Sequence, residues 1–197
     1  MSSTPNNVTR RGRNHWRPLI WGGAACLLLL PAVAMQFTQE VNLGAEDFVV
    51  MGAMLFAACA LYELATWLSG NPAYRAAFGV AVVTGFLTVW VNLAVGMFGS
   101  ENNALNLMFA GVLLIAALGA LLANFRPLGM ARAMGLAAIA QLLAAGTGLA
   151  VGLWVGMGEH DGSDVALEAF LTACFALPWI ASALLFRKAA RDGVGIS

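Results

Sequence analysis

The chain has few charged residues, and this scarcity excludes a soluble globular domain. Only 10% of its 197 residues are charged, while 60% are hydrophobic. Soluble domains carry about 25% charged residues, so the composition is typical of a polytopic membrane protein. The longest segment outside the predicted membrane spans is the arm over residues 1–17, which is too short for a soluble catalytic domain.

Histidine and lysine are missing from the apolar runs, and their absence removes several intramembrane chemistries. His15 and His160 both lie outside the predicted spans, which excludes bis-histidine haem ligation and a Ser-His protease. The single lysine, Lys188, lies at a span end, which excludes a buried Schiff base. Neither H-E-x-x-H nor a Walker loop occurs. We therefore predict no enzyme, no cofactor and no nucleic-acid partner.

Cysteine is also scarce. Cys26, Cys59 and Cys174 all fall inside apolar runs. An odd count without a C-x-x-C motif argues against a disulfide framework, so we interpret these residues as small apolar core residues.

What the sequence does contain is six apolar segments long enough to cross a bilayer. They cover residues 18–37, 47–68, 76–98, 104–124, 131–155 and 165–187. We predict an all-α fold of six transmembrane helices over residues 18–187, between a disordered basic arm (1–17) and a short tail (188–197). The first segment also imitates a secretory signal that ends at Ala32-Val33-Ala34, so its cleavage remains an alternative.

The charges are distributed unequally between the two sides of this topology. All of the basic residues fall on the side shared by the termini: Arg10, Arg11, Arg13, Arg17, Arg75, Arg126, Arg132, Arg187, Lys188 and Arg191. Most acidic residues fall on or near the other side: Glu40, Glu46, Asp47, Glu101, Glu159, Asp161, Asp164 and Glu168. The positive-inside rule then predicts that both termini are cytoplasmic.

Two spans resemble each other. Residues 79–98 align without a gap on residues 135–154, so that Leu93-Ala94-Val95-Gly96 falls on Leu149-Ala150-Val151-Gly152. The fourth helix also ends in Phe125-Arg126 and the sixth in Phe186-Arg187. We interpret the chain as three similar helical hairpins, with chance similarity between apolar helices as the alternative.

The fifth span carries a ridge of small residues at every fourth position, where a neighbouring backbone can approach closely. Its members are Ala140, Ala144, Gly148, Gly152 and Gly156, and the alignment maps them onto Thr84, Thr88, Asn92, Gly96 and Ser100. We expect the third and fifth helices to face each other along these ridges, with the tightest contact at Gly148 and Gly152. A homodimer face is the alternative.

Carboxylates gather on the predicted outer side, together with one histidine. The candidate outer acidic cluster comprises Glu101, Glu159, His160, Asp161, Asp164 and Glu168. Oxygen ligands with one imidazole suit a divalent cation or a cation-attracting mouth. We favour the simpler interpretation that these acids complement the N-terminal dipoles of helices that begin on this side, and we predict no metal site.

Two polar residues lie deeper in the spans. Glu63 is a candidate for proton or cation coupling, although we favour snorkelling or pairing with an arginine as the simpler explanation. Asn92 lies too deep to snorkel, so we expect an interhelical hydrogen bond. Gln36 and Gln141 are judged to lie nearer the span ends and to be less informative.

The chain resembles small inner-membrane proteins of proteobacteria that carry no assigned function. The resemblance lies in residues 21–38, Asp47-Phe48-Val49 and residues 90–101. This resemblance implies a multi-pass protein of the bacterial inner membrane and lends no mechanism.

Two functions remain. The first is a non-catalytic accessory or assembly partner that packs against itself or a larger membrane complex, and the second is a small cation-coupled carrier or channel.

Overall fold

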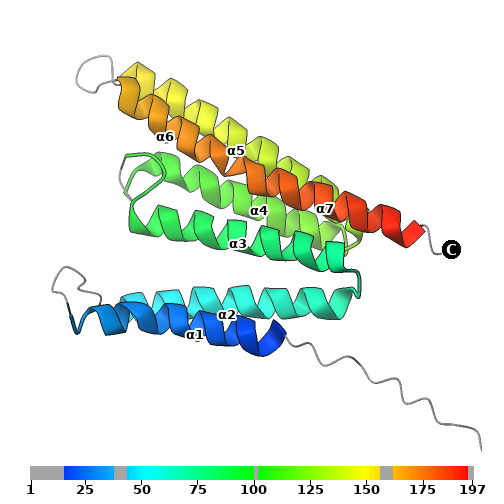
Figure 1. Cartoon of the computed structure of the whole chain (residues 1–197). Helices are drawn as coiled ribbons and strands as arrows, with labels where there is room; N and C mark the ends of the chain where they lie inside the picture. The colour runs from blue at the N-terminus through cyan, green and yellow to red at the C-terminus, as the bar shows by residue number, and fades with distance from the viewer. Residues whose placement is uncertain (1–15, 38–43, 100–101, 156–161, 195–197) are drawn as a thin grey trace, which may run out of the picture. The chain divides into compact units, whose positions relative to one another are not determined.

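A computed structural model describes residues 16–37, 44–99, 102–155 and 162–194. All regular secondary structure in these ranges is helical, as predicted (Figure 1). The helices are α1 (Trp16–Ala34), α2 (Ala45–Leu68), α3 (Pro72–Ala94), the short 3-10 helix η1 (Ala104–Asn106), α4 (Leu107–Leu122), α5 (Pro127–Val155), α6 (Gly162–Cys174) and α7 (Ala176–Val194).

Five of the helical segments are long and apolar enough to cross a membrane. They are α2, α3, η1 with α4, α5, and α6 with α7, whereas the apolar part of α1 (Pro18–Ala34) is shorter. At 1.5 Å per residue, the 28-residue span within α5 extends about 42 Å, which exceeds a hydrocarbon core of about 30 Å. Several such helices in one chain define a multi-pass membrane protein.

Helix α3 begins four residues before the predicted start because Asn71 caps it. The Asn71 side chain accepts hydrogen bonds from the backbone N–H groups of Ala73 and Tyr74, at 2.8 and 3.2 Å. Pro72 occupies the first turn, where its missing N–H costs nothing. The helix also ends earlier than predicted, at Ala94, because Gly96 has a φ of +76°, which a helix does not allow.

The predicted sixth span is two helices rather than one. Phe175 separates α6 from α7, and its N–H donates to the Thr172 carbonyl at 3.2 Å in a tighter turn. Pro178 explains the break, since it has no N–H to offer the Cys174 carbonyl one turn earlier.

The chain divides into two compact units, residues 1–59 and 60–197. In the first unit, α1 packs on the first half of α2. The rings of Trp21 and Phe56 meet edge to face with centroids 5.6 Å apart, and Leu28 lies over Gly52.

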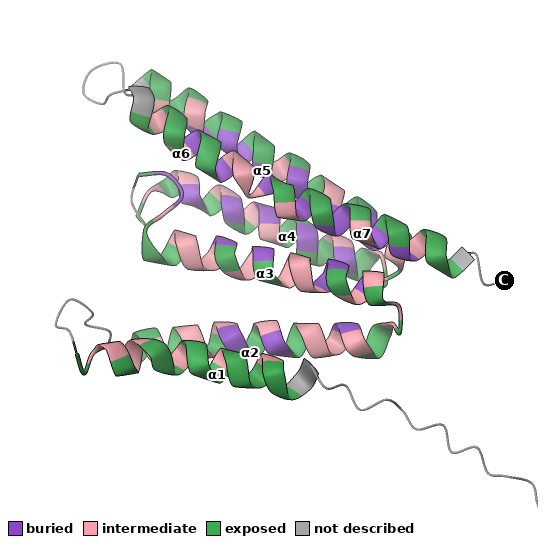
Figure 2. Ribbon diagram, viewed as in Figure 1, coloured by how far each residue is buried: buried purple, intermediate pink, exposed green. Residues whose placement is uncertain are grey.

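In the second unit, α5 is the central helix. It packs against α4, α6 and α7, while α3 packs mainly against α7. Buried residues line the facing sides of these helices, and exposed residues line their outer sides (Figure 2). Alanines supply much of this core, so the helix axes can approach closely, and the largest fully buried side chain is Trp179.

Helices α4 and α5 approach each other closely at small residues. A Cβ atom placed on Gly119 would lie 2.6 Å from the Cβ of Ala133, and one placed on Gly129 would lie 2.5 Å from the Cβ of Ala123. The turn between the helices is correspondingly tight, because Asn124 and Phe125 both adopt positive φ, at 47° and 56°. This small-residue contact lies next to the connecting turn, which the ridge analysis did not single out.

Candidate functional site

The polar residues of α3 bond along their own helix. The Thr84 hydroxyl donates to the Val80 carbonyl at 2.7 Å, and the Thr88 hydroxyl donates to the Thr84 carbonyl at 2.8 Å. The Asn92 amide nitrogen donates to the Thr88 carbonyl at 2.7 Å, so the interhelical bond predicted for Asn92 is not the one it makes. Its Oδ1 atom is buried and has no hydrogen-bond partner in the part of the chain that the structure describes.

Gln141 and Ser182 each make a hydrogen bond between helices. Gln141 of α5 donates through Nε2 to the Thr172 carbonyl of α6 at 3.0 Å. Ser182 of α7 donates to the Ala77 carbonyl of α3 at 2.8 Å. Gln141 is fully buried at the midpoint of α5, which corrects our placement of this residue near a span end. Its Oε1 atom is buried and has no hydrogen-bond partner within the described ranges.

The turn after α3 is bound into the bundle by three polar side chains. We call residues 95–99 the α3 turn. Asn106 accepts from the N–H groups of Met97 and Phe98 at 3.1 and 3.0 Å. Glu168 accepts from the N–H of Gly99 at 3.2 Å, and Thr172 donates to the Met97 carbonyl at 3.4 Å. These bonds allow Met97 and Phe98 to be buried although they lie outside a helix.

The ridge of α5 packs against this turn and α6 instead of against a ridge on α3. An added Cβ on Gly148 would overlap the ring of Phe98, and one on Gly152 would overlap Val165. The expectation that the third and fifth helices face each other is therefore wrong for the described residues, where α3 packs mainly on α7.

The remaining ridge residues have different environments. Ala144 and Thr88 are buried, and Ala140 is partly buried against the core. Gly96 lies in the α3 turn rather than in a helix. Gly156 and Ser100 lie outside the described residues.

The described acids of the predicted outer side serve helix starts and the α3 turn. Asp47 accepts from the N–H of Gly44 at 2.9 Å, and Glu46 lies in the same first turn of α2. Asp164 lies in the first turn of α6 and is exposed. Glu168 binds the α3 turn. These positions complement the positive end of a helix dipole or satisfy a backbone donor.

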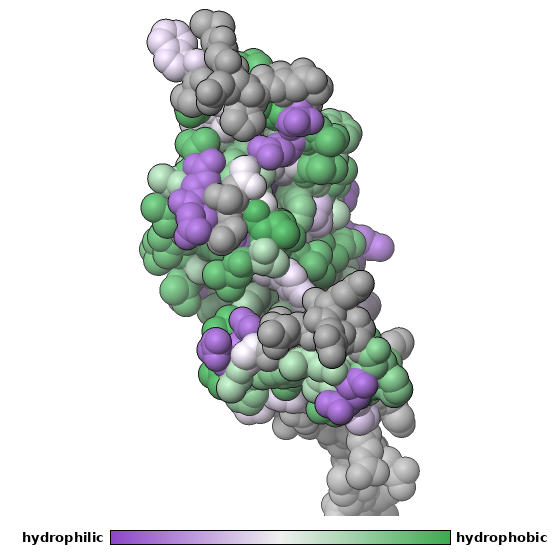
Figure 3. Space-filling model, turned by 90° about the vertical axis from the view of Figure 1, so that its left-hand side faces the viewer, coloured by the Kyte–Doolittle hydropathy of each residue, from purple (hydrophilic) through white to green (hydrophobic). Residues whose placement is uncertain are grey.

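Figure 3 views the bundle from this end and shows hydrophilic side chains among hydrophobic ones. Within residues 16–37, 44–99, 102–155 and 162–194, no group of three or more potential metal ligands comes together. The other members of the candidate cluster, Glu101, Glu159, His160 and Asp161, lie outside these ranges.

Glu63 is half-buried near the opposite end of the bundle. Its backbone carbonyl accepts from the Thr66 hydroxyl at 2.8 Å. The guanidinium of the nearby Arg75 donates to two carbonyls at the end of α2. These are the carbonyls of Ser69 and Thr66, at 2.8 and 3.2 Å. Arg75 thus satisfies two of the carbonyl groups that a helix end leaves without N–H partners.

Sequence reasoning missed Asn106, Thr172 and the role of Glu168. The available signal was the run Gly96 to Asn106, in which two glycines and three asparagines interrupt an apolar pattern. Such a run predicts a turn, but it does not indicate that the turn is buried. Comparison of the chain with protein-family models, curated proteins and solved structures finds no match.

Proposed function

We propose that the chain is a non-catalytic multi-pass protein of a bacterial inner membrane, which acts as an accessory or assembly partner through helix packing. The observation that carries this proposal is how the bundle uses its buried polar groups. The buried hydroxyls and amides of Thr88, Asn106, Gln141 and Ser182 bond to backbone atoms of the bundle itself. Such bonds stabilise a helix or join it to its neighbours, whereas a catalytic or transport site must direct its groups at a substrate.

The surface of α4 supports packing against a partner helix. Its outer side exposes Leu107, Leu114, Leu118, Leu121 and Leu122. An apolar helix side of this kind fits acyl chains or another transmembrane helix, so the proposal requires that some of it is covered in the native membrane.

Site-directed photo-crosslinking in native membranes tests the proposal. The crosslinker is placed at Leu118 or Leu122, which are 54% and 84% exposed, and at Val112, which is 2% exposed, as the matched control on the same helix. We expect one discrete crosslinked band from the exposed positions and none from Val112. A chain that gives no band at either position, and that always migrates alone after mild solubilisation, would contradict the proposal.

A second candidate function is a small cation-coupled carrier or channel. The buried amide oxygens of Asn92 and Gln141 favour it, because neither has a hydrogen-bond partner in the described chain. Cation flux into proteoliposomes is the test, with Glu63→Gln, Asn92→Leu and Gln141→Leu compared with the unaltered protein. Flux that is unchanged in all three variants would remove the roles proposed for these residues.

A further inference from the structure

Four aromatic rings cluster where α3 and α5 begin and α4 and α7 end. We call this end of the bundle the arginine end. The Tyr74 and Phe186 rings meet edge to face with centroids 5.1 Å apart. The ring centroid of Phe78 lies 6.4 Å from that of Phe125 and 6.5 Å from that of Phe186. The Tyr74 hydroxyl donates to the Phe125 carbonyl at 2.8 Å, which joins the turn between α4 and α5 to the same cluster.

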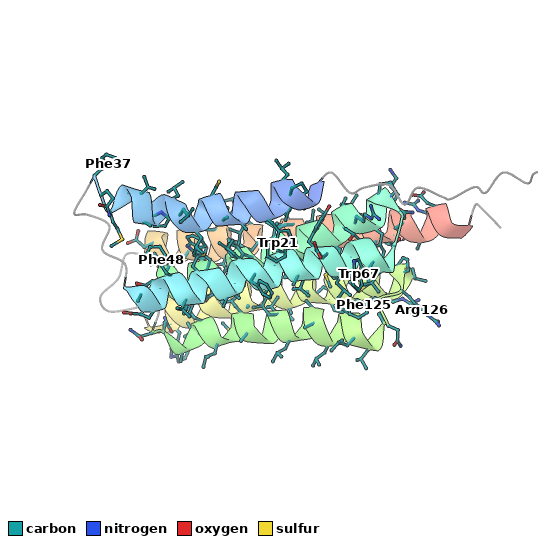
Figure 4. All side chains as sticks on the ribbon, turned by 90° about the horizontal axis from the view of Figure 1, so that it is seen from below. Trp21, Phe37, Phe48, Trp67, Phe125 and Arg126 are labelled. Carbon is teal, nitrogen blue, oxygen red and sulfur yellow. The ribbon has the colours of Figure 1, made fainter. Side chains whose placement is uncertain are left out.

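Three of these aromatic residues are each followed directly by an arginine. The arginine after Tyr74 is Arg75, whose guanidinium is bound to the end of α2. The arginines after Phe125 and Phe186 are Arg126 and Arg187, and both are exposed. Figure 4 shows Phe125 and Arg126 next to each other at this end of the bundle. Two guanidinium groups therefore remain at the surface of the cluster.

The cluster also joins the two segments that carry these arginines. The Phe125 carbonyl carbon is bonded to the Arg126 nitrogen, and Tyr74 contacts both that carbonyl and the Phe186 ring. One tyrosine side chain thus spans the distance between the two segments. Arginine side chains are long and flexible, and the planar guanidinium binds a phosphate through paired hydrogen bonds. Two arginines on segments joined in this way are therefore suited to share one phosphate.

We propose that Arg126 and Arg187 bind the headgroup phosphate of an anionic phospholipid at the arginine end. Charge complementarity supports a lipid, since Lys188 and Arg191 are also exposed on the last turns of α7 and the nearest acid in sequence is Asp192. The apolar surface supports the same occupant, because Leu122 and Leu128 are 84% and 52% exposed on either side of Arg126 along the chain. Basic sites between transmembrane helices bind such headgroups on the cytoplasmic side. This inference does not depend on the proposed function.

Native mass spectrometry of the full-length protein in detergent tests the site. Phosphatidylglycerol and phosphatidylcholine with the same acyl chains are titrated into the unaltered chain and into the double variant Arg126→Gln with Arg187→Gln. The matched control is Arg10→Gln with Arg11→Gln, which removes the same charge from the N-terminal arm. We expect the unaltered chain to prefer phosphatidylglycerol, and the Arg126/Arg187 variant to bind it at least about tenfold more weakly. The arm variant should keep the preference.

Three results would overturn the inference. They are equal binding of the two lipids by the unaltered chain, an equal loss in the two double variants, and displacement of phosphatidylglycerol by an equal concentration of inorganic phosphate. Circular dichroism reports whether the Arg126/Arg187 variant folds. If it does not, the unaltered chain still decides the matter, since raising NaCl from about 0.1 to 1 M should weaken phosphatidylglycerol binding and leave phosphatidylcholine binding unchanged.

Discussion

At the scale of single residues, two glycines of α5 show how position determines what a glycine does. A Cβ added to Gly148 would overlap the Phe98 ring, whereas a Cβ added to Gly146 would meet nothing within 4 Å. Both residues lie in the same helix, so both have the same intrinsic cost relative to alanine. Only Gly148 makes room for a neighbouring side chain.

We predict that Gly148→Ala lowers the free energy of unfolding by about 1–3 kcal/mol, because the added methyl group displaces the ring of Phe98. Gly146→Ala is the matched control and should be neutral or raise stability by up to about 1 kcal/mol. Reversible unfolding in mixed micelles, followed by tryptophan fluorescence, measures both values. Equal effects of the two substitutions would show that Phe98 does not pack on Gly148.

At the scale of elements, two irregular segments lie inside an otherwise helical bundle. One is the α6–α7 break at Phe175, and the other is the α3 turn. Irregular backbone is tolerated at membrane depth only where protein or water satisfies its polar groups. Thr172 contacts both segments, since its carbonyl accepts from Phe175 and Gln141 and its hydroxyl donates to Met97. The two irregularities are therefore coupled through one residue.

We predict that Pro178→Ala extends α7 toward α6, because the new N–H can donate to the Cys174 carbonyl. Hydrogen–deuterium exchange of residues 174–178 should slow by about two- to tenfold. This change in rate corresponds to the net free energy of one hydrogen bond. Pro127→Ala is the control, since Pro127 begins α5 and its N–H would have no carbonyl partner within the helix. If exchange is unchanged in the Pro178 variant, packing rather than proline maintains the break.

Asn106→Ala should destabilise the α3 turn. Two buried N–H groups lose their acceptor, which costs about 1–3 kcal/mol each when no other partner replaces it. Asn103→Ala is the comparison, because the Asn103 side chain accepts a bond from the Leu105 N–H at the start of η1. Thermal unfolding should show a larger loss for the Asn106 variant. A loss no larger than that of the Asn103 variant would contradict the buried arrangement.

At the scale of the whole molecule, the distribution of charge along the chain is the strongest information about orientation. All the arginines and the lysine belong to the predicted side of the termini, and most acids belong to the other. The cost of moving a cationic side chain across lipid maintains such a difference. Because of this cost, basic and acidic loops alternate between successive predicted spans.

We predict that single cysteines introduced at Ser163 and Ser197 lie on opposite sides of the membrane, in a background where Cys26, Cys59 and Cys174 are replaced by serine. A membrane-impermeant thiol reagent added to intact cells should label position 163 and not position 197. After the cells are lysed, both should be labelled. Labelling of both positions in intact cells would overturn the orientation.

The positions of the helices could be predicted from the sequence more reliably than their contacts. Each long apolar run is helical, although the sixth is divided into two helices. The errors fell where local chemistry begins or interrupts a helix, as at the Asn71 cap and the Pro178 break. The glycine ridge also marked a site of close packing at Gly148. Its partner was assigned wrongly, because small residues show where something can approach and not what approaches.

The sequence alone determined that the chain is helical, apolar and divided in charge, because those properties depend on residue type and order along one chain. Only the tertiary structure decided that Asn106, Glu168 and Thr172 bind the α3 turn, and that Arg126 and Arg187 follow residues of one aromatic cluster. Helices of similar composition can pack in many orders with similar burial. The choice among those orders depends on a few hydrogen bonds and close contacts between residues far apart in the sequence.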